Sequence, residues 1–329
     1  MEKVKRVKAA LQGEEVDRVP ISVWMHYPSV DQDAKMLAKR QVLFQKKFDL
    51  DFIKLMPFGL YSAQDWGCQV KFFCDEIRSP VVAEHGIESE ADWGELKPLS
   101  AEFGNWGQQL QLTQYMKEWG DSEVPFVQTI FSPLTTAYKL AGDRLFSDIK
   151  TEPKLVHHAL EIITQTTKES VARNIEAGAA GIFFATQCAT YDMLDDEMYQ
   201  EFGIRYDLPV IKESNRQGGW FNILHIHGSR VMFSKLKDYP VQALNWHDRQ
   251  VKPDLQRARE MTDKCLIGGL DEQGPISQGT SEEVTEQVVK TIREAKKQKL
   301  MIGPGCVAFP NTPEENIYAA RLAVETSGR

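Results

Sequence analysis

The sequence predicts a (β/α)8 barrel, and three observations support this prediction. Apolar, β-rich runs alternate with helical stretches over nearly all of the 329 residues. These runs are continuously apolar, as expected for parallel strands that are covered on both faces. Neither G-x-G-x-x-G after the first run nor G-x-x-x-x-G-K-[ST] occurs, so the main signatures of open nucleotide-binding sheets are missing. A doubly wound open sheet is the alternative architecture.

Eight apolar runs are the predicted strands of this barrel. They are Val19–Met25, Phe52–Met56, Phe126–Phe131, Gly181–Ala185, Trp220–His227, Ala243–Trp246, Cys265–Gly269 and Leu300–Gly303. The helices between them have clear start signals. Thr280-Ser281-Glu282-Glu283 predicts the start of a helix that reaches Lys297, because a hydroxyl is followed by acids in the first turn. Thr312-Pro313-Glu314-Glu315 predicts the last helix, with proline in its first turn.

One stretch departs from the alternation of strands and helices. Residues 59–123 are rich in glycine, tryptophan and acids, and they follow the second predicted strand. We interpret them as a partly helical excursion that packs over the barrel mouth; a simple surface elaboration is the alternative. No repeat, low-complexity tract or linker divides the chain, so residues 1–329 are predicted to form a single domain.

Composition and charge limit the classes of partner. The formal net charge of -8 argues against nucleic acid or an anionic membrane surface as the main partner. No apolar stretch is long enough to cross a bilayer, and the charged amphipathic start does not resemble a secretory signal. Five cysteines (Cys68, Cys74, Cys188, Cys265 and Cys306) are an odd number, which fits a reducing compartment. A cytoplasmic protein is therefore expected.

Two predicted strand ends carry ligand types that zinc prefers. His225 and His227 end the fifth predicted strand, and their spacing of two places both imidazoles on one face of an extended segment. Cys306 follows the eighth predicted strand, where Gly305 lets the backbone approach closely. Because carboxyl ends of barrel strands meet at one face, these three residues are predicted to hold Zn²⁺ with one position open. Hydrogen-bonded core histidines and an ordinary buried cysteine are the alternative.

Other polar residues at strand ends are candidates for catalysis. His247 and Asp248, after the sixth strand, are a candidate acid/base pair or a support for metal ligands. His26, after the first strand, is a candidate substrate contact or a satisfied strand-end histidine. Asp271, after two glycines, either positions a ligand or bonds the backbone of its own turn.

A further set of residues at the strand ends is predicted to contact the substrate. Its members share a position near the barrel mouth and are aromatic or amide side chains. They are Trp24, Tyr27, Gln128, Phe131, Phe184, Gln187 and Trp246.

Several stretches, spread over most of the chain, carry a family resemblance through their order and spacing. They are Phe131-Ser132-Pro133-Leu134-Thr135-Thr136-Ala137-Tyr138-Lys139-Leu140-Ala141-Gly142, Ala177-Gly178-Ala179, Leu224-His225-Ile226-His227-Gly228, Gly268-Gly269-Leu270-Asp271, Gly279-Thr280-Ser281-Glu282-Glu283-Val284, Gly303-Pro304-Gly305-Cys306 and Asn311-Thr312-Pro313-Glu314-Glu315-Asn316. Through these stretches the chain resembles the uroporphyrinogen decarboxylase superfamily. The resemblance implies a (β/α)8 barrel that is often dimeric.

The chain departs from the decarboxylases of that superfamily at three places. Their arginine-rich signature after the first strand is here His26-Tyr27-Pro28-Ser29-Val30-Asp31. Their essential aspartate after the second strand is replaced within Leu55-Met56-Pro57-Phe58, and their late G-H-G is Gly303-Pro304-Gly305-Cys306. These departures argue against porphyrinogen decarboxylation.

The corrinoid-linked methyltransferases of the superfamily match better. They carry zinc-binding H-x-C on the fifth strand and a cysteine on the eighth. Here His225 and Cys306 match, and His227 replaces the middle cysteine. A set with one thiolate fewer makes the metal more electrophilic, which suits an oxygen or nitrogen group better than a thiol.

The resemblance and the ligand set together lead to one hypothesis. The chain is expected to be a zinc-dependent methyltransferase that works with a methyl-corrinoid (cobalamin) on a separate protein. It has no D-x-H-x-x-G motif of its own for a corrinoid. A metal-free decarboxylase and a non-catalytic binding or assembly protein for a corrinoid protein are the alternatives.

Overall fold

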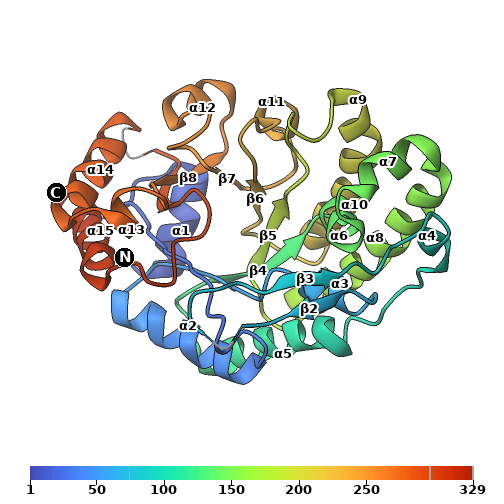
Figure 1. The fold of residues 1–329 in the computed structure, drawn as a ribbon. Helices are drawn as coiled ribbons and strands as arrows, with labels where there is room; N and C mark the ends of the chain where they lie inside the picture. The colour runs from blue at the N-terminus through green and yellow to red at the C-terminus, as the bar shows by residue number, and fades with distance from the viewer. Residues whose placement is uncertain (74, 296–297, 328–329) are drawn as a thin grey trace.

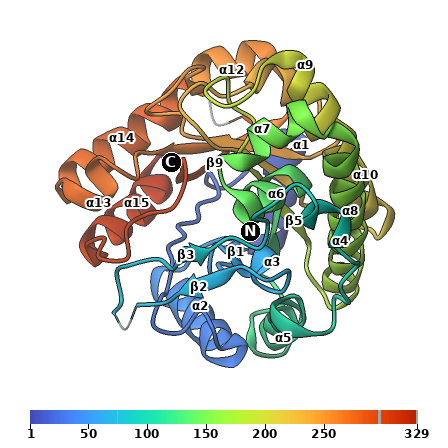
Figure 2. The same cartoon turned by 45° about the vertical axis from the view of Figure 1, so that its right-hand side comes forward.

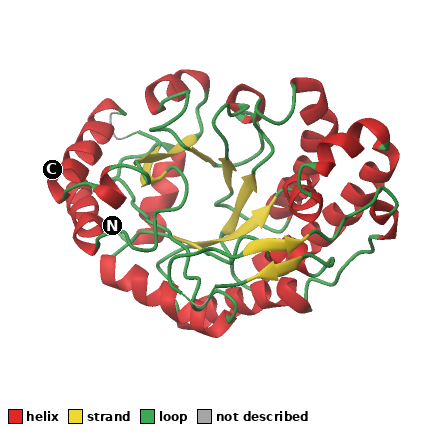
Figure 3. Cartoon of the chain, viewed as in Figure 1, coloured by secondary structure: helices red, strands yellow, loops and turns green. Residues whose placement is uncertain are grey.

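The core of the protein is a curled sheet of parallel strands inside a layer of helices (Figure 1, Figure 3). The computed structural model describes residues 1–73, 75–295 and 298–327. Seven strands pair in the order β1-β4-β5-β6-β7-β8-β9. They are β1 (Ile53–Lys54), β4 (Phe126–Phe131), β5 (Gly181–Thr186), β6 (Ile223–Ile226), β7 (Ala243–Trp246), β8 (Cys265–Leu270) and β9 (Leu300–Pro304). All seven fall on predicted strands, and all their pairings are parallel, as predicted.

The first predicted strand, Val19–Met25, is not a regular strand, and this corrects the prediction. It touches β9 through an isolated parallel bridge between Ile21 and Ile302. Ile302 N donates to Pro20 O at 2.8 Å, and on the other side Asp51 N donates to Ile21 O at 2.8 Å. Because Pro20 has no N–H, this segment cannot form a complete ladder. Residues 19–25 therefore lie between β9 and the residues that lead into β1 without forming a regular strand.

Most long helices lie outside the sheet, where they cover its outer face (Figure 2). They are α1 (Lys3–Gln12), α2 (Ala34–Phe48), α5 (Gly104–Trp119), α6 (Pro133–Ala141), α7 (Arg144–Thr151), α8 (Pro153–Glu176), α10 (Arg205–Arg216), α14 (Ser281–Glu294) and α15 (Glu314–Thr326). Shorter pieces are α3 (Tyr61–Gln64), α4 (Asp92–Glu95), α9 (Asp196–Tyr199), the π-helical turn η1 (Gln200–Ile204), α11 (Phe233–Leu236), α12 (Leu255–Met261) and α13 (Pro275–Gln278). Within the described ranges, none of these helices has the length and apolar character needed to cross a membrane.

The two predicted helix starts agree with the structure to within one residue. Thr280 caps α14, and the side chains of Thr280 and Glu283 each bond the other's backbone N–H. The predicted end of this helix at Lys297 lies outside the described residues. Pro313 is the N-cap of α15 and not its first helical residue.

The predicted excursion, residues 59–123, contains α3, α4, α5 and an antiparallel pair of strands, β2 (Gln69–Lys71) and β3 (Val81–Glu84). The pair β2–β3 lies beside α3 (Figure 1, Figure 2). Helix α5 packs against α2 and α8 and thus belongs to the outer helical layer. The placement of the rest over the barrel mouth stays a prediction.

A buried ionic cluster joins the N-terminal helix to the start of the sheet. Asp51 is fully buried and accepts hydrogen bonds from Arg6 Nη1 at 2.7 Å and from Arg18 Nη1 at 2.5 Å. It also accepts the backbone N–H of Ile21 at 2.8 Å. One carboxylate thus holds α1, the irregular segment 19–25 and the entrance to β1 together, which compensates for the missing strand ladder.

We expect Asp51→Ala to lower the free energy of unfolding by about 3–5 kcal/mol, because Arg18 then loses its buried carboxylate partner and Arg6 keeps only the half-exposed Asp17. Urea denaturation measures this change, with the same dependence of the unfolding free energy on urea concentration in variant and wild type. Glu314→Ala is the matched control, since Glu314 pairs with Lys47 on the surface, and its expected cost is below about 1 kcal/mol. Equal small effects in both variants would contradict the structural role of Asp51.

Candidate metal centre

The register of the sheet brings one row of side chains to its inner face. Phe131 pairs with Ala185, Ala185 with His225, and His225 with Asn245. Side chains directly opposite one another in neighbouring strands point to the same face. Phe131, Ala185 and His225 all line one cavity of about 90 Å³. The row therefore carries His225 to the interior of the curled sheet.

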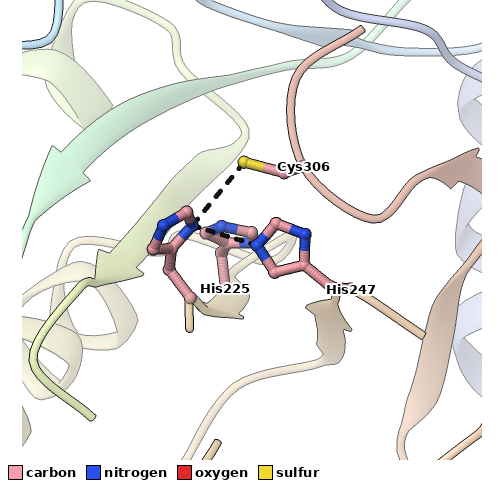
Figure 4. A group of neighbouring side chains, drawn as sticks. His225, His247 and Cys306 are labelled. Atoms are coloured by element: carbon pink, nitrogen blue, oxygen red, sulfur yellow. Dashed lines mark hydrogen bonds between the residues drawn. The ribbon is translucent and has the colours of Figure 1, made fainter. Parts of the chain in front are cut away.

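Four residues with metal-ligand chemistry converge beside this cavity (Figure 4). His225 lies in β6, His227 directly after it, His247 after β7 and Cys306 after β9. Their candidate ligand atoms all lie within 4.8 Å of one another. The structure thus brings together the three predicted ligands and adds His247, which was predicted only as an acid/base residue or support.

His227 is the residue that touches two other members of the cluster. Its Nδ1 lies 3.0 Å from Nε2 of His247 and 3.8 Å from Sγ of Cys306. Two nitrogens on one tetrahedral zinc lie about 3.3 Å apart, given Zn–N bonds of about 2.0–2.1 Å. The spacing of these two ring nitrogens is close to that value.

Asn245 fixes the orientation and the tautomer of His225. Its Nδ2 donates to Ile267 O at 2.9 Å and to Pro304 O at 3.0 Å. The side-chain oxygen must therefore be the atom 2.7 Å from His225 Nδ1, and it accepts a hydrogen bond from the N–H of that nitrogen. His225 consequently keeps the lone pair of Nε2 free for the cluster, as a metal-binding histidine requires.

Glu272 likewise orients the imidazole of His247. Its Oε1 accepts a hydrogen bond from His247 Nδ1 at 2.6 Å, and its Oε2 accepts the N–H of Gly305 at 3.1 Å. A Cβ on Gly305 would come within 2.8 Å of His247 Cα and 2.9 Å of Trp246 O. Only glycine therefore permits this approach, as the sequence predicted, and it holds the loop of Cys306 against β7.

The sequence analysis missed Glu272 and gave Asn245 no role. Glu272 directly follows Asp271, the acid that was chosen at the end of the seventh predicted strand. Asn245 was visible as a polar residue inside an apolar run, which is a costly place for an amide without partners. The cost of burying this amide was the signal in the sequence that Asn245 has hydrogen-bond partners.

The histidines change the protonation of Cys306. Burial alone would raise the pKa of this thiol, but its contacts with the rings of His225, His227 and His247 hold its pKa well below the usual value. Burial opposes the charged form of His247, yet its contacts with Cys306 and Glu272 raise its pKa to about 10. Without a metal the pair is therefore a thiolate beside an imidazolium, and the thiolate is the form of cysteine that binds a metal.

The donor set fits a zinc ion. One thiolate and neutral imidazoles are ordinary zinc ligands, and hydrogen bonds to Asn245 and Glu272 orient two of the rings. The group lies at the carboxyl ends of β6, β7 and β9, where barrels place their chemistry. The residues present could thus hold such an ion next to a cavity.

Several residues predicted to contact the substrate lie at cavities, and their role as substrate contacts stays a prediction. Trp24, His26, Phe131 and Gln187 line the cavity beside the cluster. Tyr27 lines a neighbouring cavity of about 280 Å³, which shares His26 with the first. Nδ1 of His26 is buried and has no hydrogen-bond partner among the described residues. Burial and the cations of Lys54 and Lys139 lower the pKa of His26 to about 4.

Three other predicted contacts face away from the cavity, and this corrects the prediction. Gln128 lies 3.5 Å from the backbone oxygen of Gln109 in α5, and Trp246 Nε1 donates to Pro253 O. Phe184 is buried between Phe183 and Ala185, which both line the cavity, so strand alternation turns it outward. A continuously apolar run does not reveal which residues face inward.

The two predicted aspartates also lie apart from the cluster. Asp248 is buried, accepts the N–H of Gly269 and lies 3.3 Å from Nε of Arg249; burial raises its pKa to about 7. Asp271 accepts the N–H of Gln273 in its own turn, at 3.2 Å. Neither carboxylate is within the four-residue cluster, because the side chains point toward neighbouring backbone.

Comparisons with known proteins agree with the fold. The uroporphyrinogen decarboxylase (URO-D) family model matches residues 2–326. Methylcobamide:CoM methyltransferase MtbA of Methanosarcina acetivorans is 22% identical over 95% of this chain and 94% of that protein. A uroporphyrinogen decarboxylase of Nitrosospira multiformis is 27% identical over 64% of this chain and 59% of that protein. A solved methyltransferase from Methanosarcina mazei has a TM-score of 0.84 at 20% identity and covers 99% of both chains, which shows a shared fold.

We expect Cys306 of metal-free protein to react with iodoacetamide at about pH 6, because its lowered pKa keeps it a thiolate there. Burial raises the pKa of Cys188 and Cys265 to about 12, so these thiols should stay unlabelled. Peptide mapping by mass spectrometry reports each site separately, and Cys306→Ser is the control. Equal labelling of Cys306, Cys188 and Cys265 would contradict the proposed thiolate.

Proposed function

The chain belongs to the uroporphyrinogen decarboxylase family, and within it we propose a zinc-dependent methyltransferase. It would move a methyl group between a small substrate and a corrinoid on a separate protein. The observation that carries this proposal is the convergence of three imidazoles and one thiol beside a cavity at the strand ends. The relative MtbA, whose name describes transfer from a methylcobamide to CoM, supports the class of reaction.

In this proposal His225, His227 and Cys306 hold the zinc, and one position stays open for the substrate. The chemistry that zinc supplies there is that of a Lewis acid, which would stabilise the oxygen left when a methyl ether loses its methyl group. A set with one thiolate leaves more positive charge on the metal than a set with two, so we favour an oxygen-linked methyl group over a thioether.

His247 and Glu272 form a dyad beside the three proposed ligands. Glu272 holds Nδ1 of His247, and Nε2 then faces the cluster. This arrangement lets His247 give a proton to the substrate atom or take one from it, as a histidine with a carboxylate partner commonly does. The sequence assigned this role to His247 with Asp248, and Glu272 replaces Asp248 as the partner.

The cavity provides a largely apolar enclosure for the substrate. Trp24, Phe131 and Phe183 line it together with His225 and Cys306. Aromatic walls exclude water and strengthen the electrostatic interactions inside. We propose that residues 59–123 add to this enclosure over the mouth of a single (β/α)8 domain, since Gly59 belongs to the lining.

The alternative of metal-free decarboxylation has less support. Binding a polycarboxylate tetrapyrrole requires several cationic side chains. In the part of the chain that the structure describes, Lys54 is the only lysine of the cavity lining and no arginine belongs to it. The cavity of about 90 Å³ is also small for such a substrate.

We expect about one zinc ion per wild-type chain, and less than about a tenth of that in His225→Ala and Cys306→Ala. His247→Ala should keep most of the zinc but lose activity, because it removes the proposed proton carrier and not a ligand. Inductively coupled plasma mass spectrometry on protein purified without chelator measures this. Zinc loss in His247→Ala would make His247 a ligand, and a metal-free wild type that takes up no zinc would end the metal proposal.

Methyl transfer from a methyl ether to reduced corrinoid, followed by the corrinoid absorbance, tests the reaction itself. The zinc-loaded protein should demethylate a small methyl ether faster than the matching methyl thioether, since a metal with one thiolate ligand favours oxygen. The rate should fall at least a hundredfold in Cys306→Ala. A faster thioether reaction would contradict the substrate preference, and no transfer with either compound would contradict the methyltransferase.

A further inference from the structure

Helix α2 lies at the edge of the molecule and carries positive charge, although the chain as a whole is acidic (Figure 1, Figure 2). Its cations are Lys35, Lys39, Arg40, Lys46 and Lys47, and none of its 15 residues is an acid. Lys47 pairs with Glu314, but among the described residues no carboxylate lies within 4.0 Å of Lys39 or Arg40. Because the formal net charge of the chain is -8, this helix differs in sign from the average surface.

Two apolar side chains lie exposed on the same side of α2. Met36 is 47% exposed and Leu43 is 55% exposed. Met36, Lys39, Arg40 and Leu43 occupy positions i, i+3, i+4 and i+7, which form one stripe along a helix. Single exposed apolar residues are ordinary on a protein surface, but these two share a stripe with two unpaired cations. We call these four residues the α2 stripe.

The α2 stripe borders a cavity close to the metal cluster. All four of its residues line the cavity of about 280 Å³, together with Glu76 and Pro310. Phe309 and Ile77, which adjoin these two lining residues in the chain, are exposed apolar side chains as well. The cavity shares His26 with the smaller cavity beside the cluster. A molecule seated on the stripe therefore lies beside the approach to the cluster.

Charge limits what can cover the α2 stripe. In a two-fold symmetric pair of this chain, the same patch of both copies meets, so the cations of the stripe would face one another and repel. A partner with an acidic surface instead complements Lys39 and Arg40, while Met36 and Leu43 pack against its apolar side chains. A small mixed surface of this kind suits a partner that binds and leaves in each catalytic cycle.

We propose that the α2 stripe is the docking surface for the protein that carries the corrinoid, and that the matching surface of this partner is acidic. The inference rests on the proposed function, in which the corrinoid reaches the cluster from another chain. It adds the place of contact and the charge of the partner's surface. Docking there brings the corrinoid to the side of the mouth that α2 borders, where the two cavities meet at His26.

Isothermal titration with corrinoid proteins tests this docking surface without a transfer reaction. The probes are the proteins of the same organism that contain D-x-H-x-x-G, each loaded with cobalamin. We expect at least one to bind, and its Kd to rise about tenfold in Lys39→Glu and in Leu43→Asp, because each change removes a contact of the stripe. Raising the salt concentration from about 50 to about 250 mM should weaken wild-type binding more than binding by Lys39→Glu.

Lys212→Glu is the matched control for the charge reversal. Lys212 is an exposed lysine of α10, which packs against α8, whereas α2 packs against α5 and α15. Its Kd should equal that of the wild type. Lys39→Arg keeps the charge of the stripe and should bind as the wild type does.

Methyl transfer to the reduced corrinoid gives a second measurement. With the corrinoid protein as acceptor, Lys39→Glu should raise KM about tenfold at an unchanged kcat, because docking is weakened and the reaction is not. With free cobalamin as acceptor, Lys39→Glu and the wild type should be equally fast.

The outcomes separate the docking surface from the proposed reaction. Equal Kd values in the wild type and both stripe variants, or no binding by any of the corrinoid proteins, would overturn the inference, even if transfer to free cobalamin is observed. A dimer that dissociates in Lys39→Glu or Leu43→Asp, measured by light scattering, would also overturn it and make the stripe a contact between copies. Binding that depends on the stripe, without methyl transfer to any corrinoid, would support the docking surface and contradict the methyltransferase.

Discussion

The pairing of His225 with Asn245 across β6 and β7 is the contact on which the geometry of the site depends. Asn245 has two donor hydrogens, and both are used by backbone oxygens of the neighbouring strands β8 and β9. The oxygen of Asn245, and not its NH₂ group, therefore faces Nδ1 of His225. Nδ1 must then carry the proton, so Nε2 is the nitrogen that faces the cluster. A rearrangement of the Asn245 amide would break three hydrogen bonds inside a dry interior, so the sheet itself holds the tautomer.

Glu272 also orients an imidazole by a buried hydrogen bond, but it does so from a loop. One carboxylate joins the imidazole of His247 to the backbone of Gly305, and thereby fixes the distance between the loops after β7 and β9. Cys306 is the next residue along the chain. The cluster is thus positioned by buried hydrogen bonds from β7 and from the loop after β8, and these are the elements between β6 and β9 in the sheet. Sites supported in this way are ordered before any ligand arrives.

Charge is distributed differently at the two ends of the molecule. At the amino-terminal end of the sheet, Asp51 neutralises Arg6 and Arg18, and this cluster closes the irregular side of the structure. At the opposite end, Lys54 lies three residues further along the chain and has no carboxylate partner among the described residues. The first arrangement is complete without a ligand and is structural.

The sequence by itself determined the positions of the seven strands of the parallel sheet and three members of the cluster, but it also predicted a regular strand at residues 19–25. Apolar runs of four to eight residues are a local signal, and ligand types at strand ends are visible because polar residues are costly there. Tertiary structure decided which residues of each run face inward, since a run buried on both faces has no alternation to show it. For that reason Phe183 lines the cavity in place of Phe184, and Gln128 and Trp246 face the helices. It also decided that His247 joins the cluster and that Glu272, not Asp271 or Asp248, supports it, because these contacts depend on loops from separate strands meeting in space.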